Sequence, residues 1–340
     1  MGVSLARKFV STPDEKTSAS VEETLAYAGA AGTLTGFMNI PLAGPIFAME
    51  MTSRNAGIAP FAAKSWGAAM AACFAGLCFI RGGLVPNLNV GGHFTYGAKA
   101  AVGTITGKEM VLSSLACGIG GAVVGTCFHK LLSFLKSVIW PSKSKPSKSV
   151  TIGKKTLVAL AIGILSVFFP QTMFWGEGSL QCVVDGQCTP FSATPHGIPN
   201  VMTQLAKVNP NMPYASGMVA LKVGLAKFFA IALASAGKFP GGVIFPLLSN
   251  GASFGHAFTS ALSSFIPTSS LVAPLMVMSF MAATLTSITR TPLATVLILA
   301  LSASGMTPLS VLLPGTLMAS YLSCWLSDRL TSDSFFSYTK

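Results

Sequence analysis

Two stretches of the chain repeat each other, and the rest of the sequence is interpreted from them. Residues 32–43 read GTLTGFMNIPLA, and residues 283–294 read ATLTSITRTPLA. Six positions are identical at a constant offset of 251 residues, as from Thr33 to Thr284 (284 − 33). In both copies an apolar stretch leads into a polar break, and a proline then opens a second apolar stretch. Because proline suits the first turn of a helix, the pattern predicts helix, break and helix in each copy, an arrangement typical of transporters built from two related halves.

The rest of the chain is dominated by long apolar stretches. Hydrophobic residues make up 51% of the 340 residues, charged residues make up 9%, and the mean hydropathy is +0.64. Soluble domains carry about 25% charged residues, and a helix that crosses a bilayer needs about 20 mostly apolar residues. The long apolar stretches lie at 61–80, 110–140, 157–173, 215–236, 271–288 and 311–326. The composition therefore predicts an all-α, multi-pass integral membrane protein, in a compartment that the sequence does not identify.

Other apolar stretches are too short to cross a bilayer alone. Residues 41–51 and 243–248 are bounded or broken by glycine and proline. Irregular backbone inside a membrane is tolerated where it is buried in protein or lines a pathway. Short pieces of this kind are typical of the discontinuous helices of transporters, so we expect these segments to border a transport site.

The 22 Lys and Arg residues outnumber the 10 Asp and Glu residues, but their placement argues against nucleic-acid binding. The positive charge is dispersed between apolar stretches and forms no basic stripe beside aromatic residues. Its densest cluster, within residues 137–155, is typical of a cytoplasmic loop that follows the positive-inside rule. The cluster consists of Lys143, Lys145, Lys148, Lys154 and Lys155.

The repeat also predicts how the chain is divided. Residues 1–24 form a polar lead-in, residues 25–82 the C-terminal part of a first repeat, residues 83–108 the connection between repeats, and residues 109–340 a second repeat. In the second repeat a Gly-rich break at residues 237–242 lies well ahead of Pro292. Its counterpart ahead of Pro41 falls upstream of Met1. We therefore expect the first repeat to be truncated, and whether Met1 is the natural start stays open.

The sequence has no pattern that is typical of an enzyme or a metal site. The four histidines are scattered, no Ser/His/Asp or Cys/His signature occurs, and the cysteines show no metal-ligand spacing. We expect no catalysis, no metal and no cofactor. Cys182 and Cys188 share a polar segment, residues 174–214, which we predict to be an extracytoplasmic loop. Whether these cysteines form a disulfide stays open.

Four short segments resemble the CLC family of chloride channels and chloride/proton antiporters. Residues 39–50, NIPLAGPIFAME, resemble the family segment Asn-x-Pro-Leu-Ala-Gly-x-x-Phe-x-x-Glu, and residues 239–246, FPGGVIFP, resemble the Pro-Gly-Gly-x-Phe-x-Pro element of its anion filter. Residues 290–293, RTPL, are similar to its Arg-x-Pro-Leu segment, and residues 176–178, GEG, to a stretch of its long extracytoplasmic loop. The agreement in order extends from about Ala26 to the C-terminus.

The resemblance implies an inverted-repeat helical fold and a homodimer with one anion pathway in each subunit. The function that it implies is transport of chloride and other small anions across a membrane, in a family that includes voltage-gated members. Gly241, Gly242, Val243, Ile244 and Phe245 match the anion-binding filter. There, backbone N–H groups at a helix start bind the anion without a full charge that would trap it. Ile244 stands where the family usually has phenylalanine, so the filter side chains are expected to differ.

Glu50 lies in an apolar stretch, where a charge costs about 2.5–3.5 kcal/mol on insertion scales. The equivalent position of the second repeat is Leu301, so repeat packing alone does not require an acid. By resemblance Glu50 matches a glutamate near the cytoplasmic end of its helix, and antiporters often carry a second glutamate next to it as a proton station. Met51 occupies that next position and cannot carry a proton, which favours channel-like transport. The alternative for Glu50 is a structural acid that pairs with Arg54.

Other family features are displaced or missing. Phe336 falls where the family has a tyrosine that contacts the central anion; an aromatic anchor at the membrane interface is the alternative. Lys227 aligns with a basic position, and either raises the local potential for anions or extends to the interface. The family segments Gly-(Lys/Arg)-Glu-x-Pro and Gly-Ser-Gly-x-Pro do not occur, and Gly107-Lys108-Glu109 lacks the proline of the first.

The missing segments leave further hypotheses beside the chloride channel. A chain without half of the filter fits a non-conducting subunit that associates with complete partners. A fragment of a chloride/proton antiporter is the other alternative.

Overall fold

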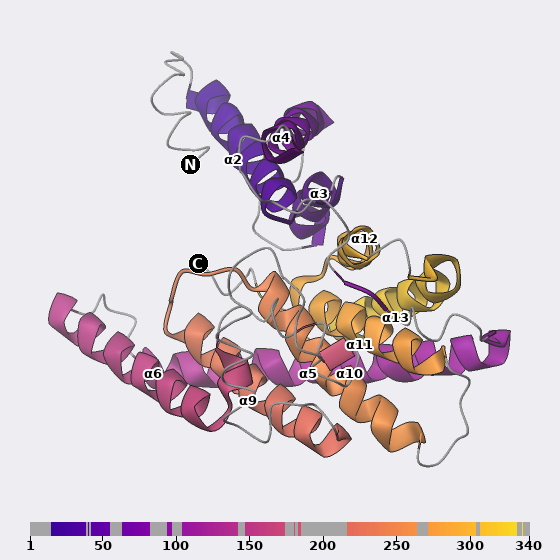
Figure 1. The fold of residues 1–340 in the computed structure, drawn as a ribbon. Helices are drawn as coiled ribbons and strands as arrows, with labels where there is room; N and C mark the ends of the chain where they lie inside the picture. Colours follow the sequence, from indigo (N-terminus) through magenta and orange to yellow (C-terminus); the bar gives the residue numbers. More distant parts are fainter. Residues whose placement is uncertain are drawn as a thin grey trace. The chain divides into compact units, whose positions relative to one another are not determined.

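A computed structural model describes most of the chain (Figure 1). The described residues are 15–38, 40, 42–54, 63–81, 94–96, 104–141, 147–173, 180, 183–184, 216–263, 271–303, 307–331 and 335. These residues are mostly helical and form no strand, although an isolated β-bridge joins Phe94 to Ala303. The chain divides into two compact units, each built from segments distant in the sequence. The two units are described separately.

The first unit consists of residues 1–94, 289–306 and 333–340. It contains α2 (Glu15–Met38), α3 (Ala43–Arg54), α4 (Ala63–Arg81) and, from the far end of the chain, α12 (Pro292–Ser302). Small residues allow α2 and α4 to approach closely. A Cβ added to Gly32 would lie 3.0 Å from the Ala72 carbonyl oxygen, and one added to Gly76 would lie 2.9 Å from the Gly32 carbonyl oxygen. The helix α3 packs against α12, which brings together in this unit the helices that follow Pro41 and open at Pro292.

The second unit consists of residues 95–288 and 307–332. Its described helices are α5 (Gly107–Ile139), α6 (Lys148–Phe168), α9 (Gly217–Ala236), α10 (Ile244–Ser263), α11 (Val272–Thr289) and α13 (Leu309–Leu330), with a short 3₁₀ helix η2 (Pro170–Thr172) after α6. The helix α9 contacts α5, α6 and α10, and α13 contacts α5.

Glycines of neighbouring helices fit against α11. A Cβ added to Gly125 of α5 would collide with Ser287, and one added to Gly121 would collide with Ala283. From the other neighbour, a Cβ added to Gly251 of α10 would lie 2.8 Å from the Cα of Met281. Without a hydrophobic effect between helices in lipid, such close packing is a main source of association.

Five helices in the described residues are long and apolar enough to cross a bilayer, namely α5, α6, α9, α11 and α13. They differ in their surroundings, because 89% of the apolar window of α11 is buried but only 6% of that of α6. The helix α11 is therefore the core of the second unit, and α6 is exposed along almost its whole length. The predicted all-α, multi-pass integral membrane protein is confirmed.

Several element boundaries differ from those expected. The helix α5 begins at Gly107, inside the expected connection 83–108, because Thr106 and Glu109 form a capping box in which the Glu109 N–H donates to Thr106 at 3.2 Å and the Thr106 N–H donates to Glu109 at 2.9 Å. The basic segment 137–155, expected as a loop, is helical up to Ile139 and again from Lys148, where Ser147 caps α6. The helix α2 begins at Glu15, inside the expected lead-in 1–24.

The helix α10 is longer than the apolar stretch 243–248 that predicted it. It continues for 20 residues to Ser263. Small hydroxyl side chains do not end the helix because they bond its own backbone: Ser253 Oγ donates to the Ser249 carbonyl at 3.0 Å, and Thr259 Oγ1 to the Gly255 carbonyl at 2.7 Å. The helix is thus longer than its apolar stretch, but α10 is not among the described helices that are long and apolar enough to cross a bilayer. The helix α3, with 12 residues, is short as expected.

Candidate functional site

The connection between α9 and α10 is a break with an exposed backbone. The helix α9 ends as the Gly237 N–H donates to the Leu233 carbonyl at 2.8 Å. Lys238 then adopts φ 55°, in the left-handed region, which costs a residue with a Cβ about 1 kcal/mol or more. The following Pro240, Gly241 and Gly242 are exposed, and α10 begins at Ile244.

Gly241 and Gly242 leave the space in front of this backbone open. A Cβ added to either would meet no atom within 4 Å, and neither glycine has a left-handed φ. Neither local packing nor backbone conformation therefore requires glycine at these positions. Glycine also allows another group to approach the backbone closely, and this is the remaining physical reason for glycine at these two positions. Such a group would lie beside the first turn of α10, at the positive end of the helix dipole.

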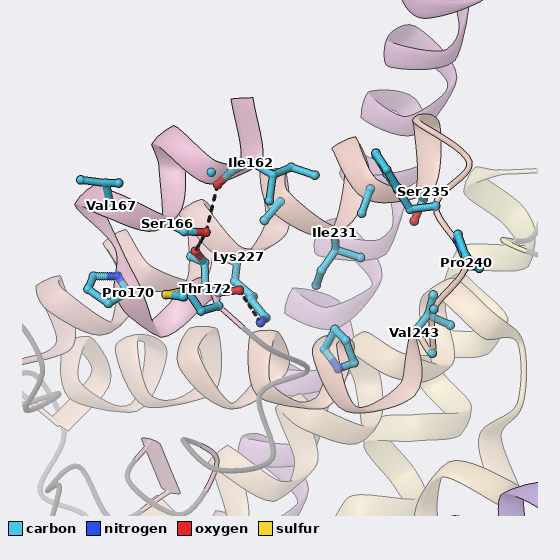
Figure 2. Close-up of a pocket in the computed structure, with 18 residues that line it drawn as sticks. Ile162, Ser166, Val167, Pro170, Thr172, Lys227, Ile231, Ser235, Pro240 and Val243 are labelled. Carbon is cyan, nitrogen blue, oxygen red and sulfur yellow. Dashed lines mark hydrogen bonds between the residues drawn. The ribbon is translucent and has the colours of Figure 1, made fainter. Parts of the chain in front are cut away.

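A pocket of about 690 Å³ opens onto the same backbone (Figure 2). Its walls come from α6, η2, α9 and the break itself, all within the second unit. Three residues of the predicted filter line the pocket, namely Gly241, Gly242 and Val243. Ile244 is half-buried and Phe245 is buried, and neither side chain is among the lining residues. The pocket therefore meets the filter segment through backbone and one aliphatic side chain.

Lys227 is the charged residue among those that line the pocket. It lies on α9 and is 3% exposed, and its Nζ donates to the Thr172 carbonyl at 2.9 Å (Figure 2). That turn is itself held in place, because Thr172 Oγ1 donates to the Phe169 carbonyl at 2.8 Å and lies 3.1 Å from Ser166 Oγ. The ammonium group is thus fixed in a largely apolar pocket, where its field is screened less than in water.

In the first unit, Glu50 binds the start of α12. Its Oε1 accepts from the Leu293 N–H at 3.0 Å, and its Oε2 accepts from the Ala294 N–H at 2.8 Å. The carboxylate is buried, with 7% of the residue exposed. Both bonds are of the charge-assisted kind, at the positive end of the helix dipole.

The carboxylate completes the first turn of α12. Pro292 has no N–H, and the Thr295 N–H donates to the Thr291 carbonyl at 3.1 Å. Leu293 and Ala294, the donors between them, are bound by Glu50. A helix start that would otherwise attract an anion is therefore already occupied by a side-chain anion.

The remaining predicted residues are placed less completely. Met51 follows Glu50 on α3 and is half-buried. Phe335 is buried, whereas Phe336, Cys182 and Cys188 lie outside the described residues, as does the side chain of Arg54. Neither the central aromatic contact nor the disulfide nor the Glu50–Arg54 pair is therefore described.

Sequence reasoning missed two contributions to these sites. It did not identify Thr172 as the carbonyl partner of Lys227, because a main-chain acceptor 55 residues away leaves no pattern of residue types. It named Glu50 but not its partners Leu293 and Ala294, which are separated from it by 243 and 244 residues. The Pro-Leu-Ala of the repeat was the available signal, since it marked α12 as a helix start with unpaired N–H groups.

Comparisons with known proteins bear on the family and the fold of the chain. A family model described as voltage gated chloride channel matches residues 1–328. Among solved structures, a CLC-type fluoride/proton antiporter is 18% identical, with a TM-score of 0.62 over 96% of this chain and 68% of that one. A slow cyanobacterial Cl⁻/H⁺ antiporter is 14% identical, with a TM-score of 0.64 over 94% of this chain and 64% of that one. Among curated proteins no match was found.

Proposed function

The chain belongs to the voltage-gated chloride channel (CLC) family, and from that premise we propose that it moves chloride and other small anions across a membrane along the break before α10. The proposal extends to a homodimeric, channel-like transporter without obligatory proton coupling. The matched structures show a shared fold, and the chain spans 68% and 64% of their lengths.

A contrast between two helix starts that follow polar breaks carries the proposal. Glu50 occupies the N–H groups at the start of α12. At the start of α10, Gly241 and Gly242 face open space, and a pocket with Lys227 adjoins them. An anion that loses its hydration shell needs donors of this kind, and partial backbone charges bind it weakly enough to release it.

Lys227 supports the same interpretation. A buried ammonium beside the pathway raises the local concentration of anions, as in other charged clefts with apolar walls. Its bond to the Thr172 carbonyl holds it in the wall, away from the position of a mobile snorkelling side chain. We therefore favour an electrostatic role for Lys227 over an interfacial one.

Substitution of Gly242 by valine should lower chloride flux at least about tenfold, because the side chain fills the space in front of the donors while meeting no atom of the chain. Flux is measured as chloride efflux from liposomes that contain the protein in its natural full length. Gly67→Val is the matched control, since an added Cβ there also meets nothing within 4 Å. Equal flux in the two variants, with both proteins correctly folded, would rule out the α10 start as the anion site.

Transport is expected to be uncoupled from protons. Glu50 is engaged by two amides, and Met51 has no proton to exchange. In the same liposomes, a chloride gradient should therefore drive no net proton movement against a proton gradient. Met51→Glu is the informative comparison, because it restores a titratable group at the position that antiporters use. Uphill proton movement by the unmodified protein would instead establish antiport, the class of transport to which the two similar solved structures belong.

A further inference from the structure

A group of lysines surrounds an anchored tryptophan at one end of the second unit. Trp140 follows α5, and its Nε1 donates to the Ala236 carbonyl at 2.8 Å, at the end of α9. The Nζ atoms of Lys154 and Lys238 lie 5.2 and 5.1 Å from the centroid of its ring. Lys155 Nζ donates to the Lys238 carbonyl at 3.3 Å and lies 5.8 Å from the ring of Phe239. We call Trp140, Lys154, Lys155 and Lys238 the lysine–tryptophan cluster.

The cluster has no acidic counterpart in the surrounding sequence. Residues 110–176 contain seven lysines and no Asp or Glu, and residues 186–327 also contain no acid. Aromatic faces stabilise the ammonium groups in part, but each ammonium has three donors. The ammonium groups of Lys154 and Lys238 lie over one indole and repel each other, and an anion placed between them relieves that repulsion. The cluster is therefore built to take an anionic group from outside the chain.

The surface next to the cluster fits an acyl chain. One turn further along α6, Leu157 and Leu160 are exposed to the extent of 67% and 59%. The largely apolar pocket is lined by Phe239, which contacts Lys155, and also by Ile162 and Pro170. The last two residues are labelled in Figure 2. A soluble anion would contact the lysines alone, whereas a lipid would contact both the lysines and this apolar surface. Only 6% of the apolar window of α6 is buried, so this apolar surface is exposed next to the lysines.

We propose that the lysine–tryptophan cluster binds the phosphate headgroup of an anionic lipid whose acyl chain lies in the pocket between α6 and α9. The lysine-rich segment places the cluster in the leaflet that positive-inside patterning assigns to the cytoplasm, where anionic lipids are common. The pocket also borders Gly241–Val243, so on the proposed function a bound lipid would hinder anions from reaching these residues. The binding proposal itself does not depend on transport.

The test uses the purified full-length protein in detergent, with its thermal unfolding midpoint titrated by added lipid. Dioleoyl phosphatidic acid should bind at least about tenfold more tightly than dioleoyl phosphatidylcholine. The combined variant Lys154→Gln, Lys155→Gln and Lys238→Gln should lose this preference. The control Lys108→Gln, Lys130→Gln and Lys222→Gln removes the same charge from exposed positions and should keep it. Equal loss in both combined variants would show non-specific attraction and overturn the proposal.

Two further measurements test whether a lipid, and not a soluble anion, binds at the lysine–tryptophan cluster and in the pocket. Inorganic phosphate should stabilise the protein far less than phosphatidic acid; equal stabilisation would assign the cluster to a soluble anion. Gly163→Phe fills the pocket without meeting an atom at its Cβ and leaves the lysines unchanged. It should weaken phosphatidic acid binding, whereas Gly67→Phe, in α4, should not. Unchanged lipid binding in Gly163→Phe would contradict the acyl-chain position. Since this test reads binding alone, its failure is distinct from a failure of the flux experiments.

Discussion

Substitution of Gly125 by leucine is expected to prevent the second unit from folding. The Cβ of any residue at this position would collide with Ser287 of α11 and lie 3.1 Å from that residue's carbonyl carbon. Because the backbone of α11 is part of the contact, a change of side-chain rotamer cannot relieve it. Overpacking of a tight core costs about 1–3 kcal/mol even where the neighbours can move, and here we expect at least about 3 kcal/mol. The detergent-solubilised protein should lose its monodisperse peak in size-exclusion chromatography.

Gly153→Leu on α6 is the matched control for this experiment. Gly153 is also in the interior of a membrane helix, but a Cβ added to it meets no atom within 4 Å. The leucine should therefore leave the chromatographic profile unchanged, and replacing glycine within a helix favours the helix slightly. A monodisperse Gly125→Leu protein would mean that α5 and α11 do not pack as described here.

The repeat predicted its second copy well and its first copy less well. The second copy has α11 ending at Thr289 and α12 starting at Pro292, as the proline pattern predicts. In the first copy α3 starts at Ala43, two residues after Pro41, and Leu42 between them has φ 67°. Local sequence rules do not predict a left-handed leucine, because a residue with a Cβ adopts that conformation only when surrounding packing imposes it.

Helix neighbours were harder to predict than the helices themselves. The apolar stretches located α4, α5, α9, α11 and α13, because hydropathy reports on the bilayer. Glycine spacing in α5 indicated a close helix contact, but it does not say which helix supplies the partner. That α11 receives glycines from both α5 and α10 follows only from tertiary structure. The same limit applies to the pocket, whose wall combines α6, η2 and α9 around one lysine.

Glu50 illustrates why related halves diverge at one position. Its equivalent in the second repeat, Leu301, is 40% exposed on α12, whereas Glu50 is buried against the start of that helix. In the first unit the two copies meet, so the acid of one copy caps the helix of the other. Leu301 does not cap a helix of the first copy in return, because a leucine side chain cannot accept a hydrogen bond. A single acidic residue in an otherwise apolar helix is explained by this asymmetry without a role in proton transfer.

Glu50→Leu, which introduces the residue of the second repeat, is expected to destabilise the first unit strongly. It would leave the Leu293 and Ala294 N–H groups unpaired in the interior, at about 1–3 kcal/mol for each lost partner. Glu50→Gln should be intermediate, because its amide oxygen accepts one of the two bonds but the charge and the second acceptor are lost. The measurement is the thermal unfolding midpoint in detergent, where a loss of this size lowers the midpoint by about 5 °C or more. Glu109→Gln is the control, since this residue lies in an exposed capping box of α5 and a glutamine there can still accept the Thr106 N–H, so the midpoint should change little. If Glu50→Leu were as stable as the unmodified protein, the carboxylate would not be the cap of α12, and a role in proton transfer would again be open for Glu50.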